Sequence, residues 1–365
     1  MTRELSDEQA RTLRLDAQQL GRDRGTEIDD AVRRVVGIQA QDAPAAGLSI
    51  RCRCPGISAA DVDRRLWHDR SIVRTWALRG TLHVVSAEDV PLIVTLLGAR
   101  FNRASRGRRG RLGLDDQTAE AGAQALEDLL GRRGPLTREE IRADPAMKHV
   151  PLHGQAAPHL IGYAALQGRI CCGPSRDGEP TYVRLDDWIS RADAPSEAQA
   201  LAVLTRRYLR GYAPAAPEDV AAWSGLTVSA AREGFAQLAD ELAEVSVAGE
   251  PMWMLAGQRA GRPSADRIVR LLPKYDTLLM GYRSRDWVLP KAHAKRIFPG
   301  GGLIRRSILS GGRIVGTWGP KREGADRLRI KVDVFEDLSL GAREALHDEI
   351  TDVARFLGRR SVESA

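Results

Sequence analysis

The chain has 365 residues, of which 43% are hydrophobic and 28% charged, and its formal net charge is +7. This length and composition are typical of a globular protein with several domains and exclude a disordered or collagen-like chain. No stretch approaches the run of about 18 apolar residues that a membrane span requires. The N-terminus has no hydrophobic signal segment, so we expect a cytoplasmic protein with no membrane partner.

The first predicted elements are three short helices followed by a hairpin. Amphipathic patterns predict helices over residues 8–20, 27–36 and 61–69. Residues 72–85 are rich in β-branched side chains and are interrupted by an Arg-Gly pair, which predicts a hairpin. Three helices and a hairpin in this order indicate a winged helix-turn-helix module.

The same order recurs twice along the chain. Helices are predicted over residues 118–131, from residue 136 and over 155–167, before strands at 168–172 and 181–185 with a turn at 174–178. Thr137 and Glu140 form the capping signal of the second helix. A third set has helices over 197–210, 218–223 and 229–239, with strands at 242–247 and 251–255. Its W-S-G-L turn gives the clearest helix-turn-helix signal.

After residue 264 the pattern changes to short strands. Strands are predicted at 268–272, 303–309, 313–318 and 328–335, with a hairpin turn at 310–312 and a final helix over about 342–357. The predicted fold class is therefore α+β, with three tandem winged-helix modules at residues 1–115, 116–193 and 194–263. A small β-rich α+β domain follows at residues 264–365.

Positive charge is concentrated in two segments. Residues 100–111 contain six Arg and no acid, and residues 283–322 contain ten basic residues and one acid, Asp286. The rest of the chain is net acidic, which codon bias toward Arg does not explain. Each run alone is compatible with a solvated surface. Two runs on a helix-turn-helix array favour duplex nucleic acid. Gly and Ser within the first run would let the backbone approach phosphates.

The sequence has no sign of a metal site or of a common nucleophile motif. The four cysteines form a C-x-C and a C-C pair, and Pro151 separates His149 from His153, so we expect reduced thiols, no metal and no cofactor. No catalytic serine motif, P-loop or two-metal acid cluster stands out. All six Lys lie outside the first module, which excludes a Schiff-base lysine there.

Two glutamines lie in an unusual segment between Gly37 and Pro44. Gly37 ends a helix and Pro44 is expected to prevent another from starting freely, so the backbone between them should be extended. An extended backbone places Gln39 and Gln41 on the same side. Their paired amides would hold a water or an abasic sugar without carrying charge. The alternative is that both amides satisfy loop backbone.

Several motifs together resemble a known family. Six motifs are involved: G-I-Q-A-Q-D at 37–42, R-T-W-A-L-R-G-T-L-H at 74–83, P-L-T-R-E-E at 135–140, W-S-G-L at 223–226, L-L-P-K-Y-D at 271–276 and G-Y-R-S-R-D at 281–286. In order and spacing they resemble the AlkZ/YcaQ group of bacterial winged-helix DNA glycosylases. The resemblance runs from about residue 5 to residue 318. It implies tandem winged helices that form a concave basic cleft. It also implies metal-independent excision of alkylated purines, including bulky N7 adducts and interstrand crosslinks.

The resemblance also implies site residues. The family's catalytic motif is Gln, an apolar residue, then Gln or Asp, and it falls on Gln39 and Gln41; the Gln form resembles the AlkZ branch, associated with self-resistance to DNA-alkylating natural products. The family uses a β-hairpin in the DNA cleft, for which residues 303–318 are the candidate and the second wing around Arg176 is the rival. The predicted DNA contacts are Arg74, Arg79, Arg100, Arg103, Arg106, Arg108, Arg109, Arg305, Arg306 and Arg313. Further cleft candidates are Asp42, His83, Tyr275 and Asp276.

The predicted function is a monofunctional DNA glycosylase that hydrolyses the N-glycosidic bond of alkylated purines in duplex DNA, in DNA repair or self-resistance. Alkylation at N7 makes guanine a good leaving group, so neutral amides would suffice to stabilise an oxocarbenium-like sugar and place a water. The alternatives are a non-catalytic winged-helix regulator and an enzyme-derived DNA-binding protein without activity. A regulator of this class is usually a dimer. The chain has no heptad repeat or long dimerisation helix, so we expect a monomeric enzyme.

Overall fold

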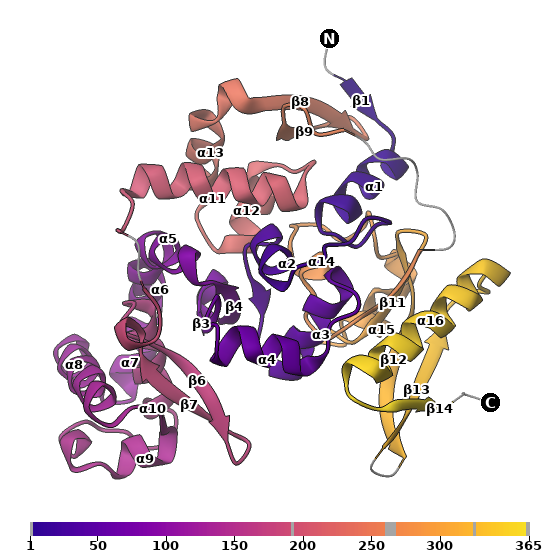
Figure 1. Cartoon of the computed structure of the whole chain (residues 1–365). Coiled ribbons are helices and arrows are strands. Elements are labelled where there is room, and N and C mark those ends of the chain that lie inside the picture. Colours follow the sequence, from indigo (N-terminus) through magenta and orange to yellow (C-terminus); the bar gives the residue numbers. More distant parts are fainter. Residues whose placement is uncertain (1–2, 191–192, 260–267, 324–325, 363–365) are drawn as a thin grey trace. The chain divides into compact units, whose positions relative to one another are not determined.

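The computed structural model describes residues 3–190, 193–259, 268–323 and 326–362 (Figure 1). The structure mixes helices and strands, as predicted for an α+β chain. It divides into two compact units, one made of Met1–Asp63 with Ala202–Ala365 and the other of Arg64–Leu201. The four predicted segments remain a proposal about module boundaries. Within the described ranges, no helix combines the length and apolar character that a bilayer span needs.

The first unit begins with short helices around an extended segment. These elements are β1 (Arg3–Leu5), α1 (Asp7–Ala17), α2 (Ile28–Arg34), β2 (Ile38–Gln39), α3 (Ala43–Arg53) and α4 (Ala59–Trp67), whose last residues enter the second unit. The side chain of Ser6 caps α1 in a capping box with Gln9. Helix α3 was not predicted, because Pro44 was expected to hinder a helix. Pro44 lies in the first turn of α3, where its missing N–H costs nothing.

The second unit opens with an antiparallel hairpin and continues with short helices. Strands β3 (Ile72–Trp76) and β4 (Leu82–Ser86) pair as predicted, and α5 (Val90–Ile93), a π-helical turn at Val94–Gly98, α6 (Ala99–Ala104) and α7 (Arg106–Arg111) follow. The first Arg run is therefore helical. Its amides take part in helix bonds, such as that from Arg109 N to Ser105 O at 2.9 Å. The approach of this backbone to phosphates stays a prediction.

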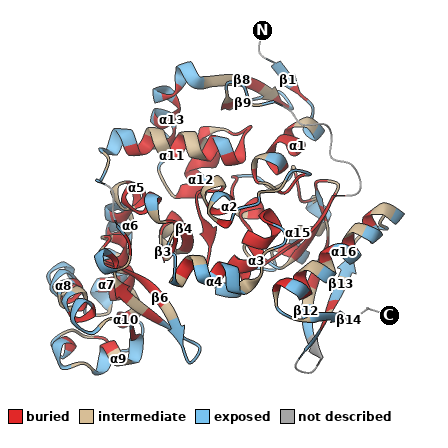
Figure 2. Ribbon diagram, viewed as in Figure 1, coloured by how far each residue is buried: buried red, intermediate tan, exposed pale blue. Residues whose placement is uncertain are grey.

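The remainder of the second unit encloses one apolar cluster. Its elements are α8 (Asp116–Arg133), β5 (Leu136–Thr137), α9 (Arg138–Ala143), α10 (Ala156–Leu166), β6 (Ile170–Arg176) and β7 (Glu179–Arg184). The strands form a sheet in the order β5-β7-β6, and Leu126, Leu130 and Leu160 lie in the cluster. The Thr137–Glu140 capping box is confirmed. Figure 2 shows that the tip of the β6–β7 hairpin is exposed.

The chain returns to the first unit through α11 (Glu197–Tyr212). Helices α12 (Pro217–Ser224) and α13 (Val228–Gln237) follow, joined by a turn in which Gly225 has a φ of 85°. A positive φ at this position favours glycine, so the turn of the predicted helix-turn-helix is well specified. Strands β8 (Leu242–Val247) and β9 (Glu250–Leu255) form a hairpin, and β1 joins β8 in parallel.

A five-stranded sheet occupies the C-terminal part of the first unit. Its order is β10 (Val269–Leu272), β11 (Ser307–Ser310), β12 (Arg313–Glu323), β13 (Arg327–Val334) and β14 (Arg360–Val362). Helices α14 (Thr277–Met280), α15 (Ala294–Ile297) and α16 (Leu340–Phe356) accompany it. Strands β12 and β13 run together as a long hairpin (Figure 1). The predicted strand at 303–309 is shorter in the structure, where β11 starts at Ser307.

Short 3₁₀ turns connect several of these elements. They are η1 (Leu78–Gly80), η2 (Ala87–Asp89), η4 (Pro145–Met147), η5 (Leu185–Asp187), η6 (Ala239–Glu241) and η7 (Lys291–His293). The core of the first unit includes Leu15, Leu272, Leu309 and Ile314, so it joins α1 to the five-stranded sheet. The N-terminal helices and the C-terminal sheet therefore share one core, which also includes Cys52 of helix α3.

Candidate active site at the start of helix α3

The structure brings the two predicted glutamines into direct contact. Gln39 ends β2 and is only 6% exposed, whereas Gln41 is exposed just before α3. The Nε2 of Gln39 donates a hydrogen bond to the Oε1 of Gln41 at 2.7 Å. The extended backbone thus places both side chains on one side, in the geometry predicted from their spacing.

The carbonyl oxygen of Gln39 is a buried acceptor without a hydrogen-bond partner. Leaving such an acceptor unsatisfied costs about 1–3 kcal/mol. The amide is oriented by the bond that its Nε2 donates to Gln41, so the free oxygen has a defined direction. An amide oxygen carries the partial negative charge that stabilises a centre of developing positive charge, and here it is shielded from bulk solvent.

The carboxylate of Asp42 is engaged in holding the same segment. Its Oδ1 accepts a hydrogen bond from the backbone N–H of Ala45 at 3.1 Å and caps α3. Its Oδ2 lies 3.6 Å from the Nζ of Lys274. The structure therefore assigns Asp42 a capping contact and an ion pair.

A fully buried ion pair anchors the C-terminal end of α3, the helix that follows the glutamines. Arg53 donates to both carboxylate oxygens of Asp276 at 2.9 Å, and Ser49 Oγ donates to the same carboxylate at 2.6 Å. Burial opposes ionisation of Asp276, but the Arg53 guanidinium and these hydrogen bonds outweigh it and lower its pKa. Asp276 was predicted as a cleft candidate. Its exposure of 0% makes it a core residue, with Tyr275 partly buried beside it.

A second buried arginine connects α3 to the C-terminal helix. Arg51 donates to Glu349 at 2.8 Å and to Asp352 at 2.7 Å, and both acids lie on α16. The side chain of Arg51 is 0% exposed. Sequence reasoning missed both arginines, because their acids are more than 200 residues away. The local sequence indicates only that Arg51 and Arg53 lie two residues apart in an otherwise apolar segment, and it does not reveal their partners.

His83, another cleft candidate, is a buried residue of β4 in the second unit. Its Nδ1 lies 2.9 Å from the backbone oxygen of Thr81, and its exposure is 1%. Burial and the nearby charge of Arg79 lower the pKa of His83 to about 3. The imidazole is therefore neutral at physiological pH and satisfies local backbone.

The first Arg run is mostly exposed, with one exception. Arg103 and Arg108 are exposed, and Arg106 pairs with Asp116 at 2.7 Å while keeping most of its side chain in solvent. Arg109 is 2% exposed and bonds Asn102 O and Ser105 Oγ, both at 2.6 Å. It holds α6 and α7 together, contrary to its predicted role in DNA contact. The other predicted contacts in this unit are the exposed Arg100 and the partly buried Arg74 and Arg79.

The predicted cleft hairpin of residues 303–318 lies inside the five-stranded sheet. A Cβ added at Gly312, in its turn, would lie 2.6 Å from the Cδ of Arg11 on α1, so the turn is covered. Arg305 and Arg313 are exposed, and the guanidinium of Arg306 lies 5.6 Å from the centroid of the Trp318 ring. Arg305 and Arg306 precede β11 and Arg313 begins β12, but the turn between the two strands is covered.

The neighbouring hairpin β12–β13 has one basic face that was not predicted. Because side chains alternate along a strand, Lys321, Arg327, Arg329 and Lys331 share one face. Leu328 and Ile330 are buried on the other face with Trp318. Lys321 lies opposite Arg329, and Asp333 adds one negative charge to the same face. This basic face, defined by the four cations, is suited to a polyanion.

Neither the titratable residues nor the thiols suggest further chemistry. Across the described ranges, no three His, Cys, Asp or Glu side chains gather in a way that would hold a metal ion. Cys52, Cys54, Cys171 and Cys172 are all buried free thiols. Burial raises the pKa of Cys54 and of Cys172 to about 11, so both remain protonated at neutral pH.

Comparison with known proteins identifies the family. A family model described as DNA glycosylase AlkZ-like matches residues 32–356, which include both glutamines and the β12–β13 hairpin. The chain belongs to the AlkZ-like DNA glycosylase family. This confirms the predicted resemblance and the prediction that the chain is an enzyme, a DNA glycosylase.

Two similar proteins come from Streptomyces sahachiroi. The AlkZ-like chain is 26% identical over 352 residues to the "Interstrand DNA cross-link repair glycosylase" of that organism, with 90% of each chain covered. It also matches the solved structure of the S. sahachiroi DNA glycosylase AlkZ with a TM-score of 0.83, at 25% identity and with 99% of both chains covered. The fold is therefore that of AlkZ over nearly the whole length.

Proposed function

We propose that this AlkZ-like chain hydrolyses the N-glycosidic bond of N7-alkylguanine and related alkylated purines in duplex DNA. Bulky adducts and interstrand crosslinks are included as substrates, and the biological role is repair or self-resistance to a genotoxic natural product. The observation that carries the proposal is the buried, unpartnered Oε1 of Gln39, held in place by Gln41. The similarity to a glycosylase named for cross-link repair supports this substrate class.

The chemistry follows from the charge of the adduct. Alkylation at N7 makes the purine cationic, so the bond between N9 and C1′ breaks with its electron pair moving to the base, which leaves neutral. The sugar becomes electron-poor, and the oxygen of Gln39 stabilises it and accepts a hydrogen bond from the attacking water. That water forms the new C1′–O bond and releases its proton to solvent. A neutral amide suffices because the leaving group needs no protonation.

DNA is bound by the exposed arginines of the first run and by the basic face of β12–β13. Three tandem winged-helix modules, a C-terminal α+β domain and a basic cleft complete the proposed architecture, with the chain acting as a monomer. The helix-turn-helix α12–α13 followed by the β8–β9 hairpin supports the third module. We assign the probing role to β12–β13, because the turn of residues 310–312 is covered by α1.

Release of 7-methylguanine from duplex DNA tests the proposal. Replacing both Gln39 and Gln41 by Ala should lower the single-turnover rate by roughly 10²–10³-fold, the usual loss for a preorganised polar group. Gln117→Ala, at an exposed position of α8, is the matched control and should retain full activity. Binding to an uncleavable duplex should not change in either variant. Equal rates for the wild type and the double variant would contradict the catalytic assignment.

Substrate charge provides a second test of the mechanism. The enzyme should release cationic 7-methylguanine readily and a neutral lesion such as 8-oxoguanine poorly, because nothing at the site protonates a neutral base. Comparable release of both lesions would show that another group acts as a general acid.

A further inference from the structure

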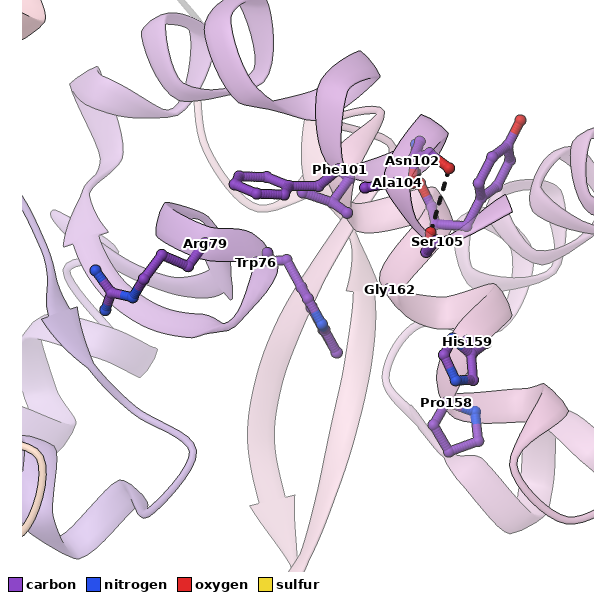
Figure 3. Close-up of a pocket in the computed structure, with 12 residues that line it drawn as sticks. Trp76, Arg79, Phe101, Asn102, Ala104, Ser105, Pro158, His159 and Gly162 are labelled. Atoms are coloured by element: carbon purple, nitrogen blue, oxygen red, sulfur yellow. Dashed lines mark hydrogen bonds between the residues drawn. The ribbon is translucent and has the colours of Figure 1, made fainter. Parts of the chain in front are cut away.

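The second unit contains an aromatic-lined cavity that does not include the glutamine pair. Its volume is about 440 Å³, which is within the range of small-molecule sites. Trp76 from the end of β3, Phe101 from α6 and His159 from α10 line it (Figure 3). Tyr163, also on α10, is a further lining residue. None of the twelve lining residues is acidic.

Two glycines place the aromatic rings at the wall. A Cβ added at Gly80 would lie 3.2 Å from the Phe101 ring, and one at Gly162 would lie 3.1 Å from the Trp76 Nε1. Gly80 and the preceding Arg79 both have positive φ, 67° and 54°. A non-glycine residue in this region stores strain, and such strain is concentrated at functional sites. The strained backbone of the turn η1 therefore holds these rings at the cavity wall.

One polar residue of the lining, Asn102, has a buried side-chain oxygen without a hydrogen-bond partner. Asn102 is 8% exposed, and its Nδ2 donates to Tyr163 O at 3.1 Å, whereas its Oδ1 has no hydrogen-bond partner. Nδ2 keeps a second N–H beside the one bonded to Tyr163, so the amide can serve as both a donor and an acceptor. His159 adds a ring whose pKa is lowered by burial and by Arg108 and Arg109, so it is neutral at pH 7.

We propose that this cavity binds a purine base. Planar heteroaromatic rings stack on aromatic side chains, and the edge of a purine carries both donors and acceptors that an amide such as that of Asn102 can pair with. The exposed arginines of α6 and α7 provide a cationic surface next to the opening for the phosphates of a strand. The base is either one extruded from DNA or a free base after excision. The inference rests on the proposed function only in taking DNA as the source of the base.

A cavity-filling variant tests the site without removing any contact. Ala104 lines the cavity from an exposed position on α6, so Ala104→Trp should occupy the space while the chain still folds. Ala99→Trp, exposed on the same helix and outside the cavity, is the matched control. The probes are free 7-methylguanine and adenine, followed by calorimetry, and a single-stranded oligonucleotide containing 2-aminopurine, followed by fluorescence quenching.

Stacking contacts of this kind change affinity by roughly 5- to 150-fold, so we expect a loss of that size in Ala104→Trp and none in Ala99→Trp. Loss of free-purine binding identifies an excised base as the ligand, and loss of 2-aminopurine quenching alone identifies a base within a strand. If both probes behave alike in the two variants, or if neither binds the wild type, the proposal is wrong. The variant with Ala at positions 39 and 41 should bind purine normally, which separates this proposal from the glycosylase assignment.

Discussion

Replacing Arg53 by Met removes the cation of the buried pair beneath the glutamines. Arg53 donates six hydrogen bonds, two of them to Asp276, and both side chains are 0% exposed. The substitution leaves the Asp276 carboxylate buried without a counterion, which typically costs 3–5 kcal/mol, or roughly a third of the stability of an average domain. Because the pKa of Asp276 is lowered, this contribution is present at neutral pH and is lost as the pH falls through the lowered pKa.

Hydrogen exchange followed by mass spectrometry locates this loss. Exchange of the α3 amides should accelerate by roughly 10²–10⁴-fold in Arg53→Met, whereas α10 in the other unit should not change. Arg355→Met is the control, because Arg355 is 42% exposed and its pair with Asp352 is worth at most about 1 kcal/mol. A response of α3 no larger in Arg53→Met than in Arg355→Met would refute the assignment of Arg53 as the anchor of this helix.

Three further predictions follow from the geometry. In ¹⁵N NMR spectra, His83 should remain neutral, with its proton on Nδ1, down to pH 5, because burial lowers its pKa to about 3; titration near pH 6.5 would contradict this. Gly98→Ala should lower the melting temperature, because the new Cβ would lie 2.1 Å from a backbone oxygen of α10, at an expected cost of about 1–3 kcal/mol. Gly110→Ala, with open space around its Cβ, should be neutral or stabilising by roughly 0.5–1 kcal/mol. Replacing Lys321 or Lys331 by Gln should in each case reduce the slope of log Kd for duplex DNA against log salt concentration by about 0.9. An unchanged slope would show that the basic face does not contact DNA.

Local sequence signals predicted most elements near their observed bounds. Helix α13 and strand β8 coincide closely with predictions from periodicity and turn residues, since Gly225 and Thr227 determine where the helix-turn-helix bends and restarts. Helix α3 was missed because Pro44 was given more weight than the cap at Asp42. The error shows that a proline two residues after a capping Asp indicates the start of a helix rather than its absence.

Contacts between distant segments were beyond the reach of sequence patterns. The parallel pairing of β1 with β8 and the ion pair between Arg53 and Asp276 each join residues more than 200 positions apart. The spacing of Gln39 and Gln41 predicted that they would meet, because the extended backbone determines that contact locally. The unpartnered oxygen of Gln39 depends on everything packed around it, so only the structure could reveal it.

The division of the first unit into two chain segments has a consequence for the order of events during synthesis. The second unit is continuous and can fold as soon as residue 201 has left the ribosome. Arg53 of α3, the helix that follows the glutamines, by contrast waits for its partner Asp276, which lies 223 residues further along. At roughly 5–20 residues per second, that delay is on the order of 10–45 s. If the proposed site residues are correct, a nascent chain would therefore present the arginines of the second unit before the helix that follows the glutamines is anchored.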